Sequence, residues 1–212
     1  MILIFDLDNT LIDRNKAYWL WLQNNVLYKC KTVDKSLILY YDNWGYTSRH
    51  HFYNWLIQKY ELSISSDELI EKCANELHQY ISKNQETLII LKRLKEQCKI
   101  VIGTNGGIQN QTNKLKATGI LPYVDHVYIS EHIGCKKPNP NFYKHIQNDL
   151  NCLSSEIMMI GDHYNQDFLV PKKLGWKSIW LSHNSTLIHD NKICALKDLI
   201  PYLRENKLLF SS

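Results

Sequence analysis

The sequence has no long hydrophobic run, no closely spaced cysteine pair and no stripe of basic residues. No apolar stretch in its 212 residues approaches the roughly 18 that a membrane span requires. Its six cysteines form no C-x-x-C pair, which argues against a zinc site and a disulfide framework. A net charge of +4 without a basic stripe suits an anionic small-molecule substrate and gives no sign of nucleic-acid binding.

Targeting and repeat features are missing as well. We find no internal repeat and no low-complexity tract. Met1 runs directly into ILIFDLD, without the basic segment or cleavage site of a signal peptide, so we expect a cytoplasmic protein. With 44% hydrophobic and 22% charged residues, the chain suits one large globular domain or a core domain with a small second one.

Short apolar runs recur along the chain and predict strands of a parallel sheet. Continuous apolar runs of this length are typical of strands buried on both faces. They occupy residues 2–5, 99–103, 126–130, 156–161 and 177–181. Helical patterns at 86–97 and 139–150 lie between them. This alternation predicts a three-layer α/β domain.

Residues 14–83 interrupt that alternation. They contain no strand-like run but four helix-like segments, at 15–29, 34–43, 48–60 and 67–82. Ser65 and Glu68 match a capping box at the start of the last segment. We therefore predict a helical insert between the first strand and the rest of the sheet.

Polar side chains follow the predicted strands at the points where they end. Asp6, Asp8 and Thr10 follow the first strand, Thr104 and Asn105 the second, Lys136 and Lys137 the third, and Asp162 and Asp167 the fourth. Ligands of parallel α/β sheets bind at these carboxyl ends. Carboxylates suit a hard cation such as Mg²⁺, and hydroxyl and ammonium groups suit phosphate. The set predicts a site for a phosphate beside a divalent ion, in which a carboxylate attacks phosphorus.

The order of these residues resembles the four motifs of the haloacid dehalogenase superfamily. The motifs are D-x-D-x-T from Asp6 to Thr10, the strand ending at Thr104, Gly134 followed by Lys137-Pro138, and Gly161-Asp162 with Asp167. The resemblance covers residues 4 to about 181. It implies a Rossmann-like core of residues 1–13 and 84–212, with a helical C1-type cap inserted at 14–83.

The resemblance also implies roles for individual residues. Asp6 is the nucleophile that forms an aspartyl-phosphate, and Asp8 is the general acid and base. Thr104, Asn105 and Lys137 are assigned to the substrate phosphate. Asp6, Asp162, Asp167 and the backbone carbonyl of Asp8 are assigned to Mg²⁺, with Asp167 supporting either the ion or Lys137. Dehalogenases of the superfamily lack the acid at the place of Asp8, so the chain resembles a phosphatase or a phosphomutase.

Some positions leave alternatives open. Lys136 is an adjacent substitute for Lys137. Val170-Pro171 replaces a small-residue pair common in the family, and we expect the helix to restart at Pro171 without disturbing the acids. In the cap, Tyr46, Arg49 and His50 are candidates for substrate recognition, against the alternative of a solvated helix face.

Three functions compete on this evidence. The favoured one is a Mg²⁺-dependent phosphatase of a small metabolite, with nucleoside 5′-monophosphates slightly preferred because the cap is rich in aromatic residues. Trp19, Trp21, Trp44 and Trp55 are expected in the cap core, with a stacking surface for a nucleobase as the alternative. The other functions are a phosphomutase of sugar phosphates and a catalytically idle binding protein. The intact acids argue against the last.

Overall fold

A computed structural model describes residues 1–182, 184, 186 and 189–209. Within these residues, six parallel strands form one sheet in the order β3-β2-β1-β4-β5-β6. The strands are β1 (Ile2–Phe5), β2 (Lys99–Thr104), β3 (His126–Ile129), β4 (Ile157–Gly161), β5 (Lys177–Leu181) and β6 (Lys192–Ile193). The predicted parallel α/β fold is confirmed, and β6 is the strand that the pattern did not predict.

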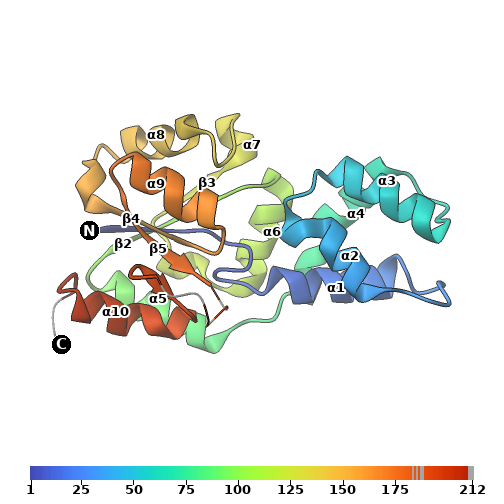
Figure 1. The fold of residues 1–212 in the computed structure, drawn as a ribbon, viewed down its shortest axis with the longest axis horizontal. Helices are drawn as coiled ribbons and strands as arrows, with labels where there is room; N and C mark the ends of the chain where they lie inside the picture. Colours follow the sequence, from blue (N-terminus) through green and yellow to red (C-terminus); the bar gives the residue numbers. More distant parts are fainter. Residues whose placement is uncertain (183, 185, 187–188, 210–212) are drawn as a thin grey trace.

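Helices cover both faces of this sheet. They are α5 (Gln85–Lys95), α6 (Ile108–Thr118), α7 (Ser130–Ile133), α8 (Pro140–Asp149), α9 (Val170–Lys173) and α10 (Leu199–Glu205). In Figure 1, α8 and α9 lie on one side of the sheet, and α5 and α10 lie on the other. The side chains of β1 alternate accordingly, since Leu3 and Phe5 pack in one buried cluster and Ile2 and Ile4 in the other. This is the three-layer arrangement expected from period-two packing of a doubly covered strand.

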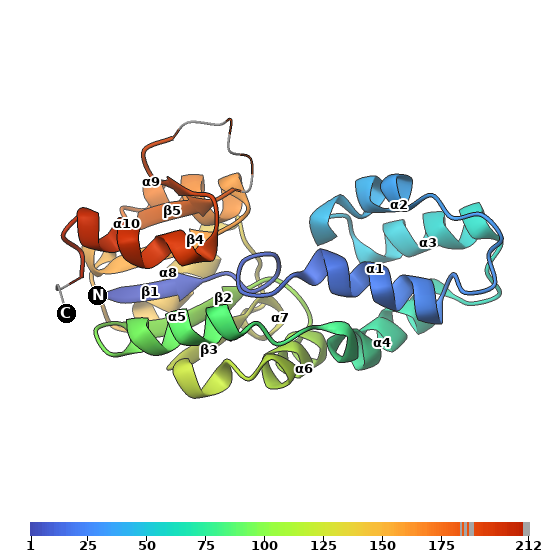
Figure 2. The same cartoon turned by 90° about the horizontal axis from the view of Figure 1, so that it is seen from below.

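The segment between β1 and α5 is helical, as predicted. It contains α1 (Arg14–Asn25), α2 (Lys35–Asp42), α3 (Arg49–Tyr60) and α4 (Ser66–Glu76), which is followed by a 3₁₀-helix at Leu77–Tyr80. Figure 2 shows these helices beside the sheet, on the side toward which β1 points. The capping box is present, because Ser65 N–H donates to Glu68 Oε2 (2.8 Å) and Glu68 N–H donates to Ser65 Oγ (3.2 Å). The cap bounds of residues 14–83 stay a prediction of the sequence.

The cap and one face of the core share a buried cluster. Tyr18, Trp21 and Phe52 of the cap belong to the same contiguous group of apolar side chains as Leu91 and Leu115 of the core. Trp21 is fully buried, and its indole N–H donates to Glu76 Oε2 (3.0 Å). The cap therefore packs continuously against the core on the α5–α6 side.

The segment after β4 adopts an unusual helix. A π-helix spans Tyr164–Leu169 and leads directly into α9, with buried Pro171 in the first turn of α9. Proline has no N–H and is tolerated in a first helical turn. The α-helix starts within one residue of the predicted restart, and Asp167 lies on the preceding π-helix. Every helix in the described part of the chain is too short or too polar to traverse a bilayer.

Candidate active site

The strand order places Asp6 at the carboxyl end of β1, directly beside β4. β1 lies between β2 and β4, and Phe5 pairs with Ile160, so Asp6 follows β1 at the level of Gly161. Asp6 N–H donates to the carbonyl of Ile160 (2.9 Å), which ties the first residue after β1 to β4. This is the point where the chain order of the sheet reverses, and it is where open α/β sheets bind ligands.

A tight turn follows β1 and places Thr10 beside the residue that follows β4. Asn9 has φ 58°, a left-handed conformation that asparagine tolerates better than most residues. The turn places Thr10 Oγ1 where it accepts a hydrogen bond from the backbone N–H of Asp162 (3.1 Å). Thr10, the last residue of the first motif, thus holds the start of the fourth motif.

Lys137 is buried between two acids. Its Nζ donates to Asp6 Oδ1 (2.8 Å) and to Asp167 Oδ1 (2.7 Å), and the residue is 2% exposed. Burial alone would lower the pKa of Lys137, but the carboxylates of Asp167 and Asp6 raise it above its ordinary value. Lys136 is exposed. The structure therefore places Lys137, rather than its neighbour, beside Asp6 and Asp167.

Asn105 positions the backbone of Lys137. Its Oδ1 accepts from Lys137 N–H (2.9 Å), and its Nδ2 donates to the Lys137 carbonyl and to Gln166 Oε1 (both 3.0 Å). The side-chain amide is thus engaged within the protein, and its predicted contact with phosphate stays a prediction. Thr104 lies at the end of β2 and is 1% exposed.

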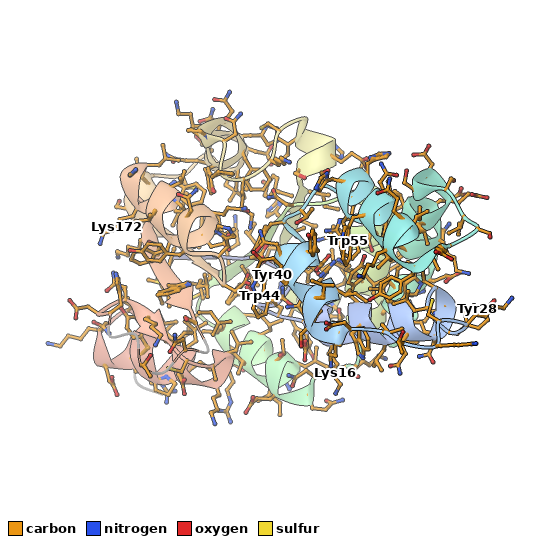
Figure 3. All side chains as sticks on the ribbon, turned by 45° about the vertical axis from the view of Figure 1, so that its right-hand side comes forward. Lys16, Tyr28, Tyr40, Trp44, Trp55 and Lys172 are labelled. Atoms are coloured by element: carbon orange, nitrogen blue, oxygen red, sulfur yellow. The ribbon has the colours of Figure 1, made fainter. Side chains whose placement is uncertain are left out.

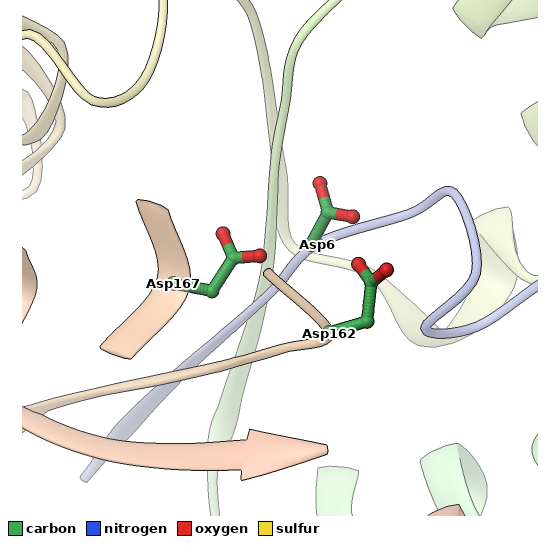
Figure 4. A group of neighbouring side chains, drawn as sticks. All are labelled: Asp6, Asp162 and Asp167. Atoms are coloured by element: carbon green, nitrogen blue, oxygen red, sulfur yellow. The ribbon is translucent and has the colours of Figure 1, made fainter. Parts of the chain in front are cut away.

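Three carboxylates converge at the sheet edge. One oxygen each from Asp6, Asp162 and Asp167 lies within 4.8 Å of the others. Figure 4 shows the three side chains pointing toward a common region. Burial raises the pKa of Asp6 to about 7, although Lys137 opposes the change. Burial and the negative charges of Asp6 and Asp167 raise the pKa of Asp162 to about 8. The cluster holds more negative charge than its one lysine compensates.

Each carboxylate oxygen of Asp167 accepts a hydrogen bond within this cluster. Its Oδ1 accepts from Lys137, and its Oδ2 accepts from the backbone N–H of His163 (3.1 Å). A Cβ added at Gly161 would lie 2.4 Å from Asp167 Cγ, so the carboxyl group occupies the space that any other residue would need. Of the two expected roles for Asp167, these contacts favour support of Lys137.

The carboxylate of Asp8 lies apart from that cluster. Lys114 Nζ donates to both of its oxygens (2.8 Å each), and Gln111 Nε2 donates to Oδ2 (3.2 Å). Gln111 Nε2 also donates to Thr104 Oγ1 (2.7 Å). The sequence analysis missed Lys114 and Gln111. Their three-residue spacing is the one signal that the sequence offers, and α6 is polar almost throughout.

The three candidate cap residues lie in different surroundings. Tyr46 packs edge-on against the ring of His163, with ring centroids 4.3 Å apart. Burial and the nearby acids, Asp162 first among them, raise the pKa of Tyr46. His50 instead pairs with Asp67 (2.9 Å) on an exposed surface. Of the three, Tyr46 is the residue that the structure brings to the acids.

Arg49 belongs to a buried ion cluster inside the cap. Asp42 is fully buried and accepts from Arg49 Nη1 (2.8 Å) and from both terminal nitrogens of Arg14. Burial would raise the pKa of Asp42, but Arg14 and Arg49 hold it below its ordinary value. Arg49 Nη2 also donates to the carbonyl of Thr47 (2.8 Å). These contacts tie the Arg49 side chain, which is 27% exposed, to the buried Asp42 of the cap.

The loop after α2 carries an exposed tryptophan. Asn43, Trp44 and Gly45 all have positive φ, a conformation that is rare for a bulky residue. Trp44 is 61% exposed and Tyr40 is 79% exposed, and both are labelled on the cap surface in Figure 3. Trp44 therefore lies outside the cap core, contrary to expectation, whereas Trp21 lies within it.

Fold and site together define an α/β enzyme that gathers carboxylates and a lysine at the carboxyl ends of parallel strands, beneath a helical cap. A family model described as haloacid dehalogenase-like hydrolase matches residues 3–181, and the chain belongs to this family. The predicted superfamily and the prediction of a hydrolytic enzyme are thereby confirmed.

Individual relatives agree with this assignment. The chain is 27% identical over 194 residues to glyceraldehyde 3-phosphate phosphatase of Pyrococcus abyssi, covering 86% of this chain and 81% of that protein. It is 23% identical to pyrimidine 5′-nucleotidase PynA of Streptococcus pneumoniae, covering 97% and 96%. The crystal structure of the putative HAD-hydrolase YfnB from Bacillus subtilis, bound to magnesium, matches the fold with a TM-score of 0.76 at 18% identity, covering 95% and 97%.

Proposed function

We infer that this protein is a phosphomonoester hydrolase that uses Asp6 as its nucleophile. The observation that supports this most directly is the position of Lys137, whose ammonium group lies 2.8 Å from Asp6 Oδ1 in a buried site. A buried cation beside a carboxylate lets that anion approach an anionic phosphate. The second acid, Asp8, favours phosphate esters over organic halides, because an alkoxide leaving group needs a proton and a halide does not.

A divalent cation fits the acid cluster. Asp6, Asp162 and Asp167 with Lys137 carry a formal charge of −2 when all four are ionised, which one Mg²⁺ ion would neutralise. Burial is the first cause of the raised pKa values of Asp6 and Asp162, and a divalent cation beside these carboxylates would lower both pKa values. Asp6 and Asp162 would hold the ion, together with the predicted backbone carbonyl of Asp8. When bound, Mg²⁺ supplies charge neutralisation of the phosphoryl group.

The reaction proceeds in two displacements at phosphorus. An oxygen of Asp6 bonds to phosphorus while the bond to the leaving oxygen breaks, and Asp8 donates its proton to that oxygen. Asp8, now a carboxylate, takes a proton from water as the water oxygen attacks phosphorus. The bond to Asp6 then breaks, and inorganic phosphate leaves. Lys137 and Thr104 hold the other phosphoryl oxygens in both steps.

The substrate class is a small phosphorylated metabolite. The two relatives described above act, by their names, on a triose phosphate and on pyrimidine nucleotides. The aromatic side chain of Tyr46, beside the acids, favours a planar leaving group such as a nucleoside. We propose nucleoside 5′-monophosphates as the first substrates to test, with residues 14–83 as the part that selects among them. A cytoplasmic location belongs to the same proposal.

A substrate panel tests this function. Phosphate release is measured from nucleoside 5′-monophosphates, triose and sugar phosphates, and p-nitrophenyl phosphate, with and without Mg²⁺. We expect Mg²⁺-dependent release, fastest with one of the metabolites. Transfer of phosphate between positions of a sugar without release would instead indicate a phosphomutase. No activity toward any ester would indicate a binding protein.

A further inference from the structure

The helix that follows β2 directs two buried polar side chains at the acid Asp8. Gln111 and Lys114 are one turn apart on α6, and they are 1% and 2% exposed. Residues with this spacing lie on the same face of a helix. Lysine and glutamine are rarely buried to this extent without partners that use their polar groups.

Lys114 engages the whole carboxylate of Asp8. Its Nζ lies 2.8 Å from Oδ1 and 2.8 Å from Oδ2, so that it contacts both oxygens equally. The Asp8 side chain is 23% exposed, whereas that of Lys114 is 2% exposed. Asp8 is therefore accessible from a side that Lys114 does not cover.

Gln111 connects the pair of Asp8 and Lys114 to the hydroxyl group of Thr104. The same Nε2 donates to Asp8 Oδ2 (3.2 Å) and to Thr104 Oγ1 (2.7 Å). Thr104 Oγ1 accepts this hydrogen bond, and its own hydroxyl makes only a long contact of 3.4 Å to the carbonyl of Asn105, which a closer phosphate oxygen would replace. One amide group thus fixes both Asp8 and the hydroxyl predicted to contact phosphate.

We propose that Lys114 is a positioning residue for Asp8 and that Gln111 supports it and sets the hydroxyl of Thr104 as a donor to phosphate. This inference rests on the proposed function, in which Asp8 transfers the proton. Lys114 fixes the plane of the carboxylate through its contacts with both oxygens. As the bond from Asp6 to phosphorus forms and the bond to the leaving oxygen breaks, Asp8 delivers its proton to that oxygen from the open side.

The test exploits two substrates of matched shape. Phenyl phosphate and p-nitrophenyl phosphate differ mainly in how much the leaving oxygen needs a proton, since phenol is the weaker acid. A correctly placed general acid is worth about 10² to 10⁴ in rate where protonation is needed. For Lys114→Met, we expect kcat/KM to fall at least about tenfold more on phenyl phosphate than on p-nitrophenyl phosphate. Lys116→Met, at an exposed position of the same helix, is the control and leaves both values unchanged.

A double-mutant cycle shows whether Lys114 acts through Asp8. In an Asp8→Asn background, Lys114→Met has no further leaving-group-dependent effect if the proposal holds. Equal losses on both aryl phosphates, or no loss, would make Lys114 a structural anchor and overturn the inference. If Lys114→Met does not fold, Gln111→Leu makes the same test, with a smaller but equally leaving-group-dependent loss expected.

Failure of the proposed function is distinguishable from failure of this inference. The proposed function fails if Asp6→Asn keeps turning over phosphate esters. The positioning role fails if Asp6→Asn is inactive while Lys114→Met and Gln111→Leu lose the same fraction of activity on both substrates.

Discussion

The core and the cap each contain a buried ion cluster, and the two clusters have opposite composition. In the core, Lys137 lies between Asp6 and Asp167, with Asp162 close by. In the cap, Asp42 lies between Arg14 and Arg49. Both clusters take charges out of water, which is costly unless every charge finds partners.

The clusters differ in how far their excess charge is satisfied. The additional donors of the cap arginines reach the Thr47 carbonyl and Asn15 Oδ1, and the guanidinium of Arg14 stacks 4.0 Å from the ring centroid of Tyr18. The excess carboxylates of the core are left with raised pKa values. Both clusters carry excess charge, but the excess donors of the cap have close acceptors, whereas the side-chain contact of Asp162 is a long one, with Thr10 Oγ1 at 3.5 Å. From this difference, we expect the cap cluster to be structural and the core cluster to be functional.

The substitution Asp6→Asn breaks the core cluster at its reacting atom, and we expect the largest effect from it. Asparagine keeps the shape but cannot attack phosphorus, so phosphate release falls at least about 10³-fold. Steady-state kinetics measure the loss, and circular dichroism checks that the fold is kept. Turnover by a folded variant free of wild-type enzyme would contradict the role of Asp6.

Removal of divalent metal tests whether the excess negative charge of the core cluster binds a cation. We expect EDTA to abolish activity and Mg²⁺ to restore it, because the cluster needs a cation. Without metal, Asp6 and Asp162 hold protons in the folded state that they release near 3.8 when unfolded. The free energy of unfolding contributed by these groups is therefore complete below about pH 4 and is lost as the pH rises through about 7 and 8.

Urea unfolding at several pH values, with and without Mg²⁺, measures that dependence. Mg²⁺ should flatten the decline in stability between about pH 4 and pH 8, and Asp162→Asn should reduce that decline without metal. Full activity in metal-stripped buffer, or the same pH dependence with and without Mg²⁺, would contradict a metal site.

The adjacent residues Lys136 and Lys137 allow a buried lysine of the core cluster to be compared with an exposed one. Lys137→Met removes the buried ammonium group and leaves Asp6 and Asp167 facing each other, so we expect kcat to fall at least about 10²-fold. Lys136→Met changes an exposed residue and should alter kcat less than about twofold. Equal losses in the two variants would show that the buried lysine does not act on the substrate.

The substitution Arg49→Ala breaks the cap cluster, and we expect it to affect stability rather than chemistry. It removes one of two arginines from Asp42, which costs roughly 1–3 kcal/mol. Thermal unfolding should shift down by about 2–4 °C per kcal/mol for a chain of this size. His50→Ala, in an exposed pair with Asp67, should change stability by less than about 0.5 kcal/mol and serves as the matched control. A change in substrate ranking with unchanged stability would instead return Arg49 to a recognition role.

A smaller and more specific effect is expected at Tyr46. Tyr46→Ala removes the cap ring that lies beside His163, so the ranking of metabolite substrates should change. Activity toward p-nitrophenyl phosphate should stay within about threefold, because the core residues hold its phosphate. Kinetic constants for both substrate types decide the matter, and unchanged ranking would place specificity elsewhere in the cap.

The predictability of the two regions differs for physical reasons. The strands of the core are continuous apolar runs, and the acids that follow them have a fixed order. The local sequence therefore predicts both the strands and the acids. β6 has two residues, which is too short for any periodic signal. The partners of Asp8 were not readable, because a polar helix such as α6 does not reveal which of its faces is buried. In the cap, the separation of Tyr46 from Arg49 and His50 depends on tertiary contacts. Tyr46 and Arg49 are three residues apart but do not share a helix, because α3 begins at Arg49 after its N-cap Ser48 and Tyr46 lies before it.

The missing side chain of Gly161 has a consequence for mutational libraries and for distant relatives. The other four residues of β4 all carry a Cβ, but a Cβ at this position would lie 2.4 Å from the carboxyl carbon of Asp167. An alanine here would force the acid out of its contact with Lys137 while leaving the strand and its hydrogen bonds in place. Position 161 thus separates selection for a functional enzyme from selection for a folded one. In a library screened only for soluble expression the site should accept alanine, and in one screened for phosphate release it should return glycine.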